Sequence, residues 1–401
     1  MFKRHRITAG CGAALIAATA LTASATGASA AAGPTTLPAS QYTLTSDYHK
    51  YDAAYSGLAS KLHTVPVHTV MDNANHDRQP LPSTFNPAGL TGGFRFDDGD
   101  NTDCTNYPQG ITTSRDAVGG DNGGNYDGHQ LVAVSWYTRD KCGGKQVRSR
   151  ITLADWDATY PNKYRKILLV EPTGTTASPN YKDIPIHAGG VSWYGDYLYV
   201  ADTGGGMRVF DMRKILEVNS GGTADQIGLS GGQYYAHNYR YVLPQVGTVA
   251  AHTTSGTNLA WSSISLDRVS KSIVMTEYTC KADCTDYPNR PPRAIRFPFA
   301  SGATTFAAST TASQALQLPW YNLNGVASHK RPLVVQLLRA ETALLLDPDG
   351  GPGHARLGEQ RGEHLVLGGP EGRGSPLVAP GGGGEPERVR GKAGQLQQLI
   401  A

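Results

Sequence analysis

The chain has 401 residues, with 36 Lys and Arg against 33 Asp and Glu, and a formal net charge of +3. Outside the N-terminus, no cluster of Lys and Arg is interleaved with aromatic residues, which argues against a nucleic-acid partner. The 20 Tyr and 48 Gly residues suit a β-rich protein with many turns.

Residues 1–30 are predicted to be a secretory signal peptide. A basic opening is followed by an apolar, alanine-rich stretch from Cys11 to Leu21, and Ala28-Ser29-Ala30 supplies the small residues of a cleavage site. The alternative is a membrane anchor, but the apolar run is shorter than the roughly 20 residues that a span requires. We therefore expect a secreted, extracellular protein without a membrane span, cleaved after Ala30 or Ala32.

Three kinds of segment are expected between the signal peptide and residue 106. Residues 31–42 are predicted to be a linker, because Ala, Pro and Thr dominate them. Apolar residues spaced three or four apart predict a helix within 43–63; they are Tyr48, Tyr51, Tyr55, Leu58 and Leu62. Residues 64–106 are expected to be irregular, with a strand at GGFRF (92–96) and an acidic loop at 97–103.

From about residue 105, one pattern of four short β-runs recurs. The first copy covers 107–114, 131–138, 149–157 and 163–172; the second covers 187–193, 197–203, 207–212 and 239–246; the third covers 261–266, 272–279, 293–299 and 315–320. A fourth copy begins at 324–328. Such repetition predicts an all-β, propeller-like domain over 43–329, with one blade per copy.

The repeat count predicts three complete blades plus the start of a fourth. If the C-terminal tail has replaced two lost repeats, the intact form would be five-bladed. As written, the chain would form an open arc with an unpaired sheet edge, which is a liability for solubility.

The tail over 330–401 differs abruptly in composition, because it contains no Phe, Tyr, Trp, Asn or Cys. We predict a low-complexity, disordered tail, with helical propensity at 334–346. Our hypothesis is that a frameshift makes the tail out-of-frame; the alternative is a genuine disordered tail. Sequencing the gene across codon 329 decides between them, since only a frameshift leaves a Tyr-, Trp- and Gly-rich sequence in another frame.

Four cysteines remain after removal of the signal peptide, which favours disulfides in an oxidising compartment. In a four-stranded blade, the segment before strand one and the turn between strands two and three share a face. Cys104 and Cys142 occupy these positions in the first repeat, while Cys280 and Cys284 share that turn of the third. We predict the pairs 104–142 and 280–284. A zinc site of four thiolates is the alternative, but paired C-x-x-C spacing is lacking.

Candidate binding residues follow from the same repeat alignment. Residues just before each first strand should surround the mouth of a central channel; these are Gln109, His187, Ser262 and Asn324. The ends of the second strands add Tyr137, Asp202 and Glu277. His187, Asp202 and Glu277 could together bind a divalent metal. The structural alternative is that the carboxylates accept hydrogen bonds from turn amides.

Calcium or another divalent metal is the only cofactor that the residues suggest. Four acidic residues precede the first repeat, and secreted proteins use such loops for Ca²⁺; they are Asp97, Asp98, Asp100 and Asp103. Their spacing is not that of an EF-hand, so a solvated acidic loop is the alternative.

The most informative runs resemble a family of exported actinobacterial β-propeller-like proteins. They are SWYT (135–138), IHAGGVSWYGDYLYVADTGGGMRVFDM (186–212), YRYVLPQV (239–246) and SISLDR (263–268). The resemblance covers about residues 105–329. It implies two further blade-like stretches after residue 328, which this chain lacks, and it implies no catalytic residue.

Two functional classes remain open, and the sequence does not decide whether the protein is an enzyme. No nucleophile elbow, P-loop or dinucleotide fingerprint occurs. The first class is a secreted binding or scaffold module for an extracellular small molecule, glycan or protein. The alternative is a metal-dependent hydrolase or lyase at the channel mouth.

The signal peptide gives the first testable prediction. Intact-mass spectrometry of protein recovered from culture medium should show an N-terminus between Ala31 and Gly33. Recovery of the uncleaved chain beginning at Met1 in the cytosol would contradict it.

Overall fold

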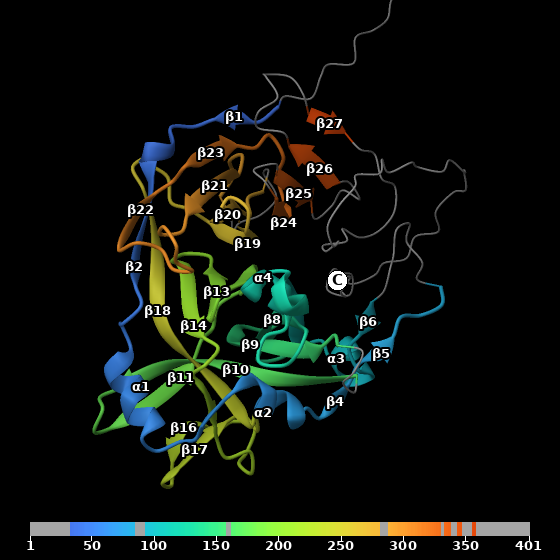
Figure 1. Ribbon diagram of the computed structural model, residues 1–401, viewed down its shortest axis with the longest axis vertical. Coiled ribbons are helices and arrows are strands. Elements are labelled where there is room, and N and C mark those ends of the chain that lie inside the picture. Colours follow the sequence, from blue (N-terminus) through green and yellow to red (C-terminus); the bar gives the residue numbers. More distant parts are fainter. Residues whose placement is uncertain are drawn as a thin grey trace, which may run out of the picture. The chain divides into compact units, whose positions relative to one another are not determined.

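The computed structural model describes residues 33–84, 93–157, 162–280 and 288–329, and three short strands at 333–337, 343–346 and 355–357 (Figure 1). The fold is mostly β. The predicted signal peptide and most of the predicted tail lie outside the described residues. None of the described helices is long and apolar enough to span a membrane.

Four antiparallel meanders of four strands follow one another along the chain, and the strands within each meander pair in chain order. The first contains β7 (Asn106–Thr113), β8 (Leu131–Arg139), β9 (Gln146–Asp155) and β10 (Lys163–Gly174). The second contains β12 (Val191–Tyr194), β13 (Tyr197–Asp202), β14 (Gly206–Asp211) and β18 (Tyr241–Thr253). The β-runs predicted for the first two repeats are therefore strands.

The third and fourth meanders continue the order. The third contains β19 (Trp261–Asp267), β20 (Ser272–Glu277), β21 (Arg293–Pro298) and β23 (Gln314–Gln317). The fourth contains β24 (Leu323–Ser328), β25 (Leu333–Leu337), β26 (Ala343–Leu346) and β27 (Ala355–Leu357).

The predicted tail therefore contains strands, and the expected helix over 334–346 is wrong. Val334 and Val335 are β-branched and suit a strand, and β25 pairs with β24 in register. The expected disorder is likewise wrong for these three segments. The rest of 330–401 is outside the described residues, and the frameshift stays a hypothesis.

Alternating side chains explain why the second meander is buried on both faces. Leu198 and Val200 of β13 belong to a core cluster shared with the first meander, whereas Tyr199 and Ala201 belong to a cluster shared with the third. Successive side chains of a strand point to opposite faces of its sheet. The near-continuous apolar run of β13 thus follows from packing between two neighbouring sheets.

The first strands of the first three meanders lie unusually close together. A Cβ on Gly110 of β7 would lie 2.6 Å from the backbone nitrogen of Val191 in β12. A Cβ on Gly190, just before β12, would lie 2.4 Å from the nitrogen of Ile264 in β19. Because β7 and β12 are the two ends of the main strand order of the largest sheet, that sheet is nearly closed and barrel-like.

One strand pairing was not expected from the repeat pattern. The outer strands of the first two meanders, β10 and β18, pair in parallel through Leu168–Val170 and Val242–Pro244. The two meanders are consequently joined into one sheet of 14 strands. Because β10 and β18 pair with each other, neither leaves its backbone N–H and C=O groups unpaired at an open sheet edge along these residues.

The predicted linker and N-terminal helix need correction. The described part of the linker contains β1 (Thr35–Thr36), which pairs with β23, and a 3-10 turn at Ala39–Gln41. β2 (Tyr42–Asp47) then pairs with β18 and with β22 (Ser309–Thr311). The helix α1 covers only Asp52–Ala59. Alternation of buried Tyr42 and Leu44 with β-branched threonines favours a strand, and the helical spacing holds only further on.

The stretch over 64–106 is also more regular than expected. It contains β3 (Thr64–Val65), α2 (Val67–Asp72), β4 (His76–Asp77), β5 (Gln79–Pro80), β6 (Phe94–Arg95) and α3 (Asp98–Thr102). The strand expected at GGFRF is confirmed as β6. The expected acidic loop is instead the short helix α3, because the Asp97 carboxylate accepts the backbone N–H of Asp100 and caps it.

The remaining elements lie between strands of one meander, except β11, which lies between the first two meanders. They are α4 (Ser114–Val118), a 3-10 turn at Asp121–Gly124, β11 (Pro179–Asp183), β15 (Ile215–Glu217), β16 (Ile227–Ser230) and β17 (Gln233–Ala236).

The close strand contact gives a stability prediction. Gly190→Ala should lower the free energy of unfolding by about 2 kcal/mol, because the added methyl group would meet the backbone of β19. Gly204→Ala is the matched control, since no heavy atom lies within 4 Å of a Cβ there. Urea unfolding measures both. Equal stability of the two variants would contradict the proposed contact.

Candidate functional site

The predicted mouth residues lie at a structural irregularity that recurs in three first strands. Strand pairing skips between Pro108 and Ile111, between Trp261 and Ser263, and between Leu323 and Gly325. The residues inside these β-bulges include Gln109, Ser262 and Asn324. Bulges bend a strand and redirect its side chains, and they are frequent beside functional sites. For Asn324, only the backbone is described.

The first strand of the second meander, β12, pairs with β13 without such a skip, but a backbone turn occurs at the matching place. Ala188, next to His187, has a φ of 51°, which is uncommon for a residue other than glycine. A Cβ on Gly189 would lie 2.4 Å from the carbonyl oxygen of Ser262. The segments that lead into the second and third meanders are therefore neighbours.

Three stacked rings, which we call the aromatic ladder, lie beside the first bulge: Tyr107, Tyr137 and His187. Tyr107 and Tyr137 are cross-strand partners on β7 and β8, with ring centroids 4.9 Å apart and an interplanar angle of 9°. The ring of His187 stacks on that of Tyr137 at 4.5 Å. Tyr137 is 6% exposed, whereas the other two rings are half-buried.

The guanidinium of Arg139 lies over the outer part of the ladder. Its central carbon is 5.4 Å from the centroid of the Tyr107 ring and 5.6 Å from that of the Tyr137 ring. Such cation–π contacts hold an arginine against aromatic faces. Burial, followed by the charge of Arg139, lowers the pKa of His187 to about 4. His187 is consequently a neutral ring at physiological pH.

Glu277, one of the three predicted metal ligands, is fully buried and neutralised by arginines. Its carboxylate accepts hydrogen bonds from Arg293 Nε at 2.7 Å and from Arg290 Nη1 and Nη2, each at 2.7 Å. The backbone N–H groups of Ala260 and Arg293 also donate to it. Burial alone would raise the pKa of Glu277, but these arginines outweigh it and hold the pKa below its ordinary value.

Asp202, the second predicted ligand, also has an arginine partner. Arg208 Nε donates to its carboxylate at 2.9 Å, while Arg208 Nη1 donates to Glu171 and Gln245. The described residues contain one group of His, Cys and carboxylates close enough to share a metal ion, and it includes none of the three. Among the described residues, the three predicted ligands His187, Asp202 and Glu277 are thus not gathered into such a group, and the two carboxylates are paired with arginines.

The group that does come together is His76, Asp97 and Asp100, whose ligand atoms lie within 4.8 Å of one another. Asp100 is buried and accepts from Tyr164 Oη at 2.6 Å, Lys166 Nζ at 2.7 Å and Arg150 Nη2 at 3.0 Å. Two cations already balance the two carboxylates, which leaves no net negative charge for a divalent ion. This cluster is best described as an ionic network around the buried Asp100 that anchors α3.

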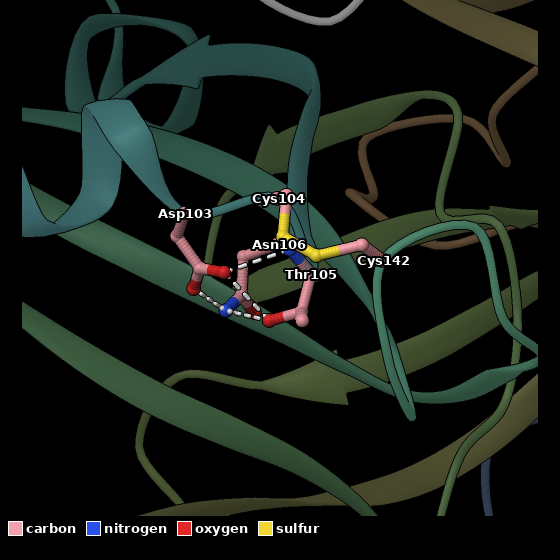
Figure 2. Close-up of a disulfide and its surroundings, with 5 residues drawn as sticks. All are labelled: Asp103, Cys104, Thr105, Asn106 and Cys142. Atoms are coloured by element: carbon pink, nitrogen blue, oxygen red, sulfur yellow. Dashed lines mark hydrogen bonds between the residues drawn. A yellow bond between two sulfur atoms is a disulfide. The ribbon is translucent and has the colours of Figure 1, made fainter.

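The four acidic residues of the predicted Ca²⁺ loop consequently contact different partners. Asp97 accepts from His76 Nδ1 at 2.7 Å, and Asp98 pairs with Arg95. Asp103 accepts hydrogen bonds from Thr105 and from the side-chain amide of Asn106, as Figure 2 shows. Since Asp100 is buried, the alternative of a wholly solvated loop is also incorrect.

A disulfide fixes the segment beside these residues. Cys104 and Cys142 are bonded, with Cα atoms 5.2 Å apart, as predicted (Figure 2). The bond ties the turn between β8 and β9 to the segment that leads into β7. Cys280 is buried, and Cys284 lies outside the described residues, so the 280–284 pair stays a prediction.

No protein-family model and no curated protein matches the chain. The case for a function depends on the geometry above. Sequence reasoning placed Tyr137 and His187 near the mouth but missed Tyr107 and Arg139. The signal for them was available, because Tyr107 precedes Gln109 by two residues and Arg139 follows Tyr137 by two, which is the spacing of side chains on one face of a regular strand.

Glu277 gives a test that separates an ion pair from a metal ligand. Glu277→Gln should lower the free energy of unfolding by about 3 kcal/mol, because Arg290 and Arg293 would lose their buried partner. Glu217→Gln is the control; its partially exposed pair with Arg240 should contribute less than about 1 kcal/mol. The contribution of Glu277 should be full above the ordinary carboxyl pKa of 4.5 and disappear as pH falls through the lowered folded-state pKa.

Urea unfolding from pH 7 to pH 2 measures these contributions. If Glu277→Gln were as stable as the original chain without metal, and only the original chain gained stability from added divalent cations, Glu277 would be a metal ligand after all.

Proposed function

We propose that the protein is an exported, propeller-like binding module whose ligand contacts the aromatic ladder. The observation that carries the proposal is the stack of Tyr107, Tyr137 and His187, which comes from two meanders and leaves two rings half-buried. Binding sites commonly combine aromatic walls with a few placed polar groups. The basic, then apolar N-terminus and the Cys104–Cys142 disulfide support export.

The propeller architecture is part of this proposal. Four four-stranded meanders in chain order, with the first three inner strands side by side, are what a radial arrangement of blades requires. We propose three complete blades and a fourth whose outer strands derive from the compositionally different tail. The parallel pairing of β10 and β18 is an additional feature of this chain. Membership of the exported actinobacterial family is proposed on the residues over 105–329 alone.

The geometry favours binding over the metal-dependent hydrolase. Catalytic carboxylates need oxygens that can reach a metal, a water or a substrate. The carboxylates of Glu277 and Asp202 instead accept hydrogen bonds from Arg290, Arg293 and Arg208. His187, with its depressed pKa, is a neutral stacking ring at the pH where a general base would operate.

Cosedimentation with insoluble cellulose, chitin, xylan, pectin and peptidoglycan tests the proposal. We expect retention on at least one of them, with Tyr107→Ala binding roughly tenfold more weakly because one stacking face is lost. Tyr235→Ala, a half-buried tyrosine on β17, is the control and should bind normally.

Two outcomes would overturn the binding module. One is an unchanged affinity of Tyr107→Ala for every retained polymer, or no retention at all. The other is release of soluble sugar that Asp202→Asn abolishes, because this would show a hydrolase that uses the channel-mouth carboxylate.

A further inference from the structure

We infer that the aromatic ladder and the adjoining β8–β9 turn bind an anionic polysaccharide, one whose sugar rings carry carboxylates. This inference rests on the proposed binding function and adds the ligand class. It follows from the charge of the turn, from its attachment to the ladder, and from the ring chemistry of the ladder itself.

The turn and the strand ends on either side of it concentrate positive charge. Residues 139–148 contain Arg139, Lys141, Lys145 and Arg148, against Asp140 as the single acid, so the stretch carries four minus one, or three, positive charges. The whole chain carries a formal charge of only +3, and Lys3, Arg4 and Arg6 of the predicted signal peptide contribute three positive charges. The mature chain is therefore formally neutral, and its residues outside 139–148 carry a net charge of −3. Lys141 and Lys145 are exposed, and within the described residues no salt bridge joins either to a carboxylate.

Two contacts hold this turn against the ladder. Arg139, whose guanidinium lies over the rings of Tyr107 and Tyr137, donates from Nη1 to the carbonyl oxygen of Gly144 at 3.0 Å. The disulfide joins Cys142, within the turn, to Cys104, three residues before Tyr107. A turn anchored in this way loses little conformational freedom when it binds, which favours affinity.

The two parts recognise different features of one ligand. The flat, weakly polar face of a sugar ring can pack on an aromatic ring such as Tyr107. Exposed ammonium groups attract carboxylates and speed their association. Because the pKa of His187 is lowered to about 4, the ladder itself stays neutral where a uronate is ionised. The positive charge therefore comes from the turn alone, and the affinity should be constant between about pH 5.5 and 8.

A nucleic acid is the less suitable polyanion. Proteins that bind nucleic acids spread Lys and Arg along a face or groove that follows the phosphate backbone. Here the two lysines of the proposed site lie four residues apart in one turn, and the chain as a whole is close to neutral. A short single-stranded DNA serves below as the competing probe.

Isothermal titration calorimetry with hexagalacturonate, cellohexaose and a short oligothymidylate tests the inference on the full mature chain. We expect binding of hexagalacturonate only, weakened by added salt. The double variant Lys141→Gln/Lys145→Gln should bind it roughly tenfold more weakly, and Tyr107→Ala should lose a similar factor.

The matched control is Lys50→Gln/Lys61→Gln. It removes the same charge from residues that precede and follow α1 in the chain, and it should bind like the original chain. Thermal unfolding should show all variants folded, since Lys141, Lys145, Lys50 and Lys61 are exposed. Equal loss in the control would show a general charge effect and overturn the site.

The other outcomes are also decisive. Binding of cellohexaose that depends on Tyr107 but not on Lys141 and Lys145 would overturn the anionic ligand while retaining the binding module. If the protein bound oligothymidylate as tightly as hexagalacturonate, the site would recognise polyanions in general, and the inference of a glycan ligand would be wrong. Absence of binding to all three probes, together with retention of a neutral polymer in cosedimentation, would overturn the inference alone.

Discussion

The arrangement of the fold depends on how closely the first strands of successive meanders approach. At Gly110 and Gly190 the neighbouring backbone lies where a Cβ would be, so these sheets can come together only where a side chain is missing. The hydroxyl of Thr112 then accepts the backbone N–H of Trp193 at 3.1 Å, which links β7 to β12 directly. The absence of a side chain at these two positions thus lets the first three meanders come together, and with them the segments that carry the candidate site.

Buried charge follows a consistent rule in this protein. Glu277 is paired with Arg290 and Arg293, Asp267 with Arg296, and Asp100 with Arg150 and Lys166. A carboxylate beyond the reach of water requires a partner of opposite charge. Arginines, with one lysine, supply that partner here, so these three buried carboxylates are neutralised within the fold. Planar, multidentate guanidinium groups are well suited to this role.

The sequence predicts the local features of this fold better than it predicts which distant side chains pair with each other. The strand runs of the three repeats and the Cys104–Cys142 bond follow from hydrophobic patterning and from the turn geometry of a four-stranded meander. The N-terminal strand β2 was predicted as a helix, because Tyr48, Tyr51 and Tyr55 carry a helical spacing that begins only after it. The sequence could not show the pairing of Glu277 with arginines, for another reason. Arg290 is 13 residues from Glu277 in the chain, and no periodicity shows which of many arginines a buried carboxylate will meet.

The candidate site illustrates how a binding surface can depend on contacts between sheets. Tyr107 and Tyr137 belong to the first meander, while His187 belongs to the segment that leads into the second. The hydroxyl of Ser135 accepts the N–H of Gly110 at 3.0 Å and donates to the carbonyl oxygen of Ala188 at 2.8 Å. One side chain therefore positions the bulge of one meander and the neighbour of His187 in the next.

Since a stacked ladder requires its rings to be about 5 Å apart, any shift between the two meanders would separate His187 from Tyr137. The same glycine contacts that allow the sheets to approach also set that spacing. Ligand affinity and the packing between the first two meanders are consequently coupled, and a substitution that loosens Gly110 or Ser135 should weaken binding without touching a ring. The ladder is an outcome of sheet packing, and its individual side chains are only part of what defines it.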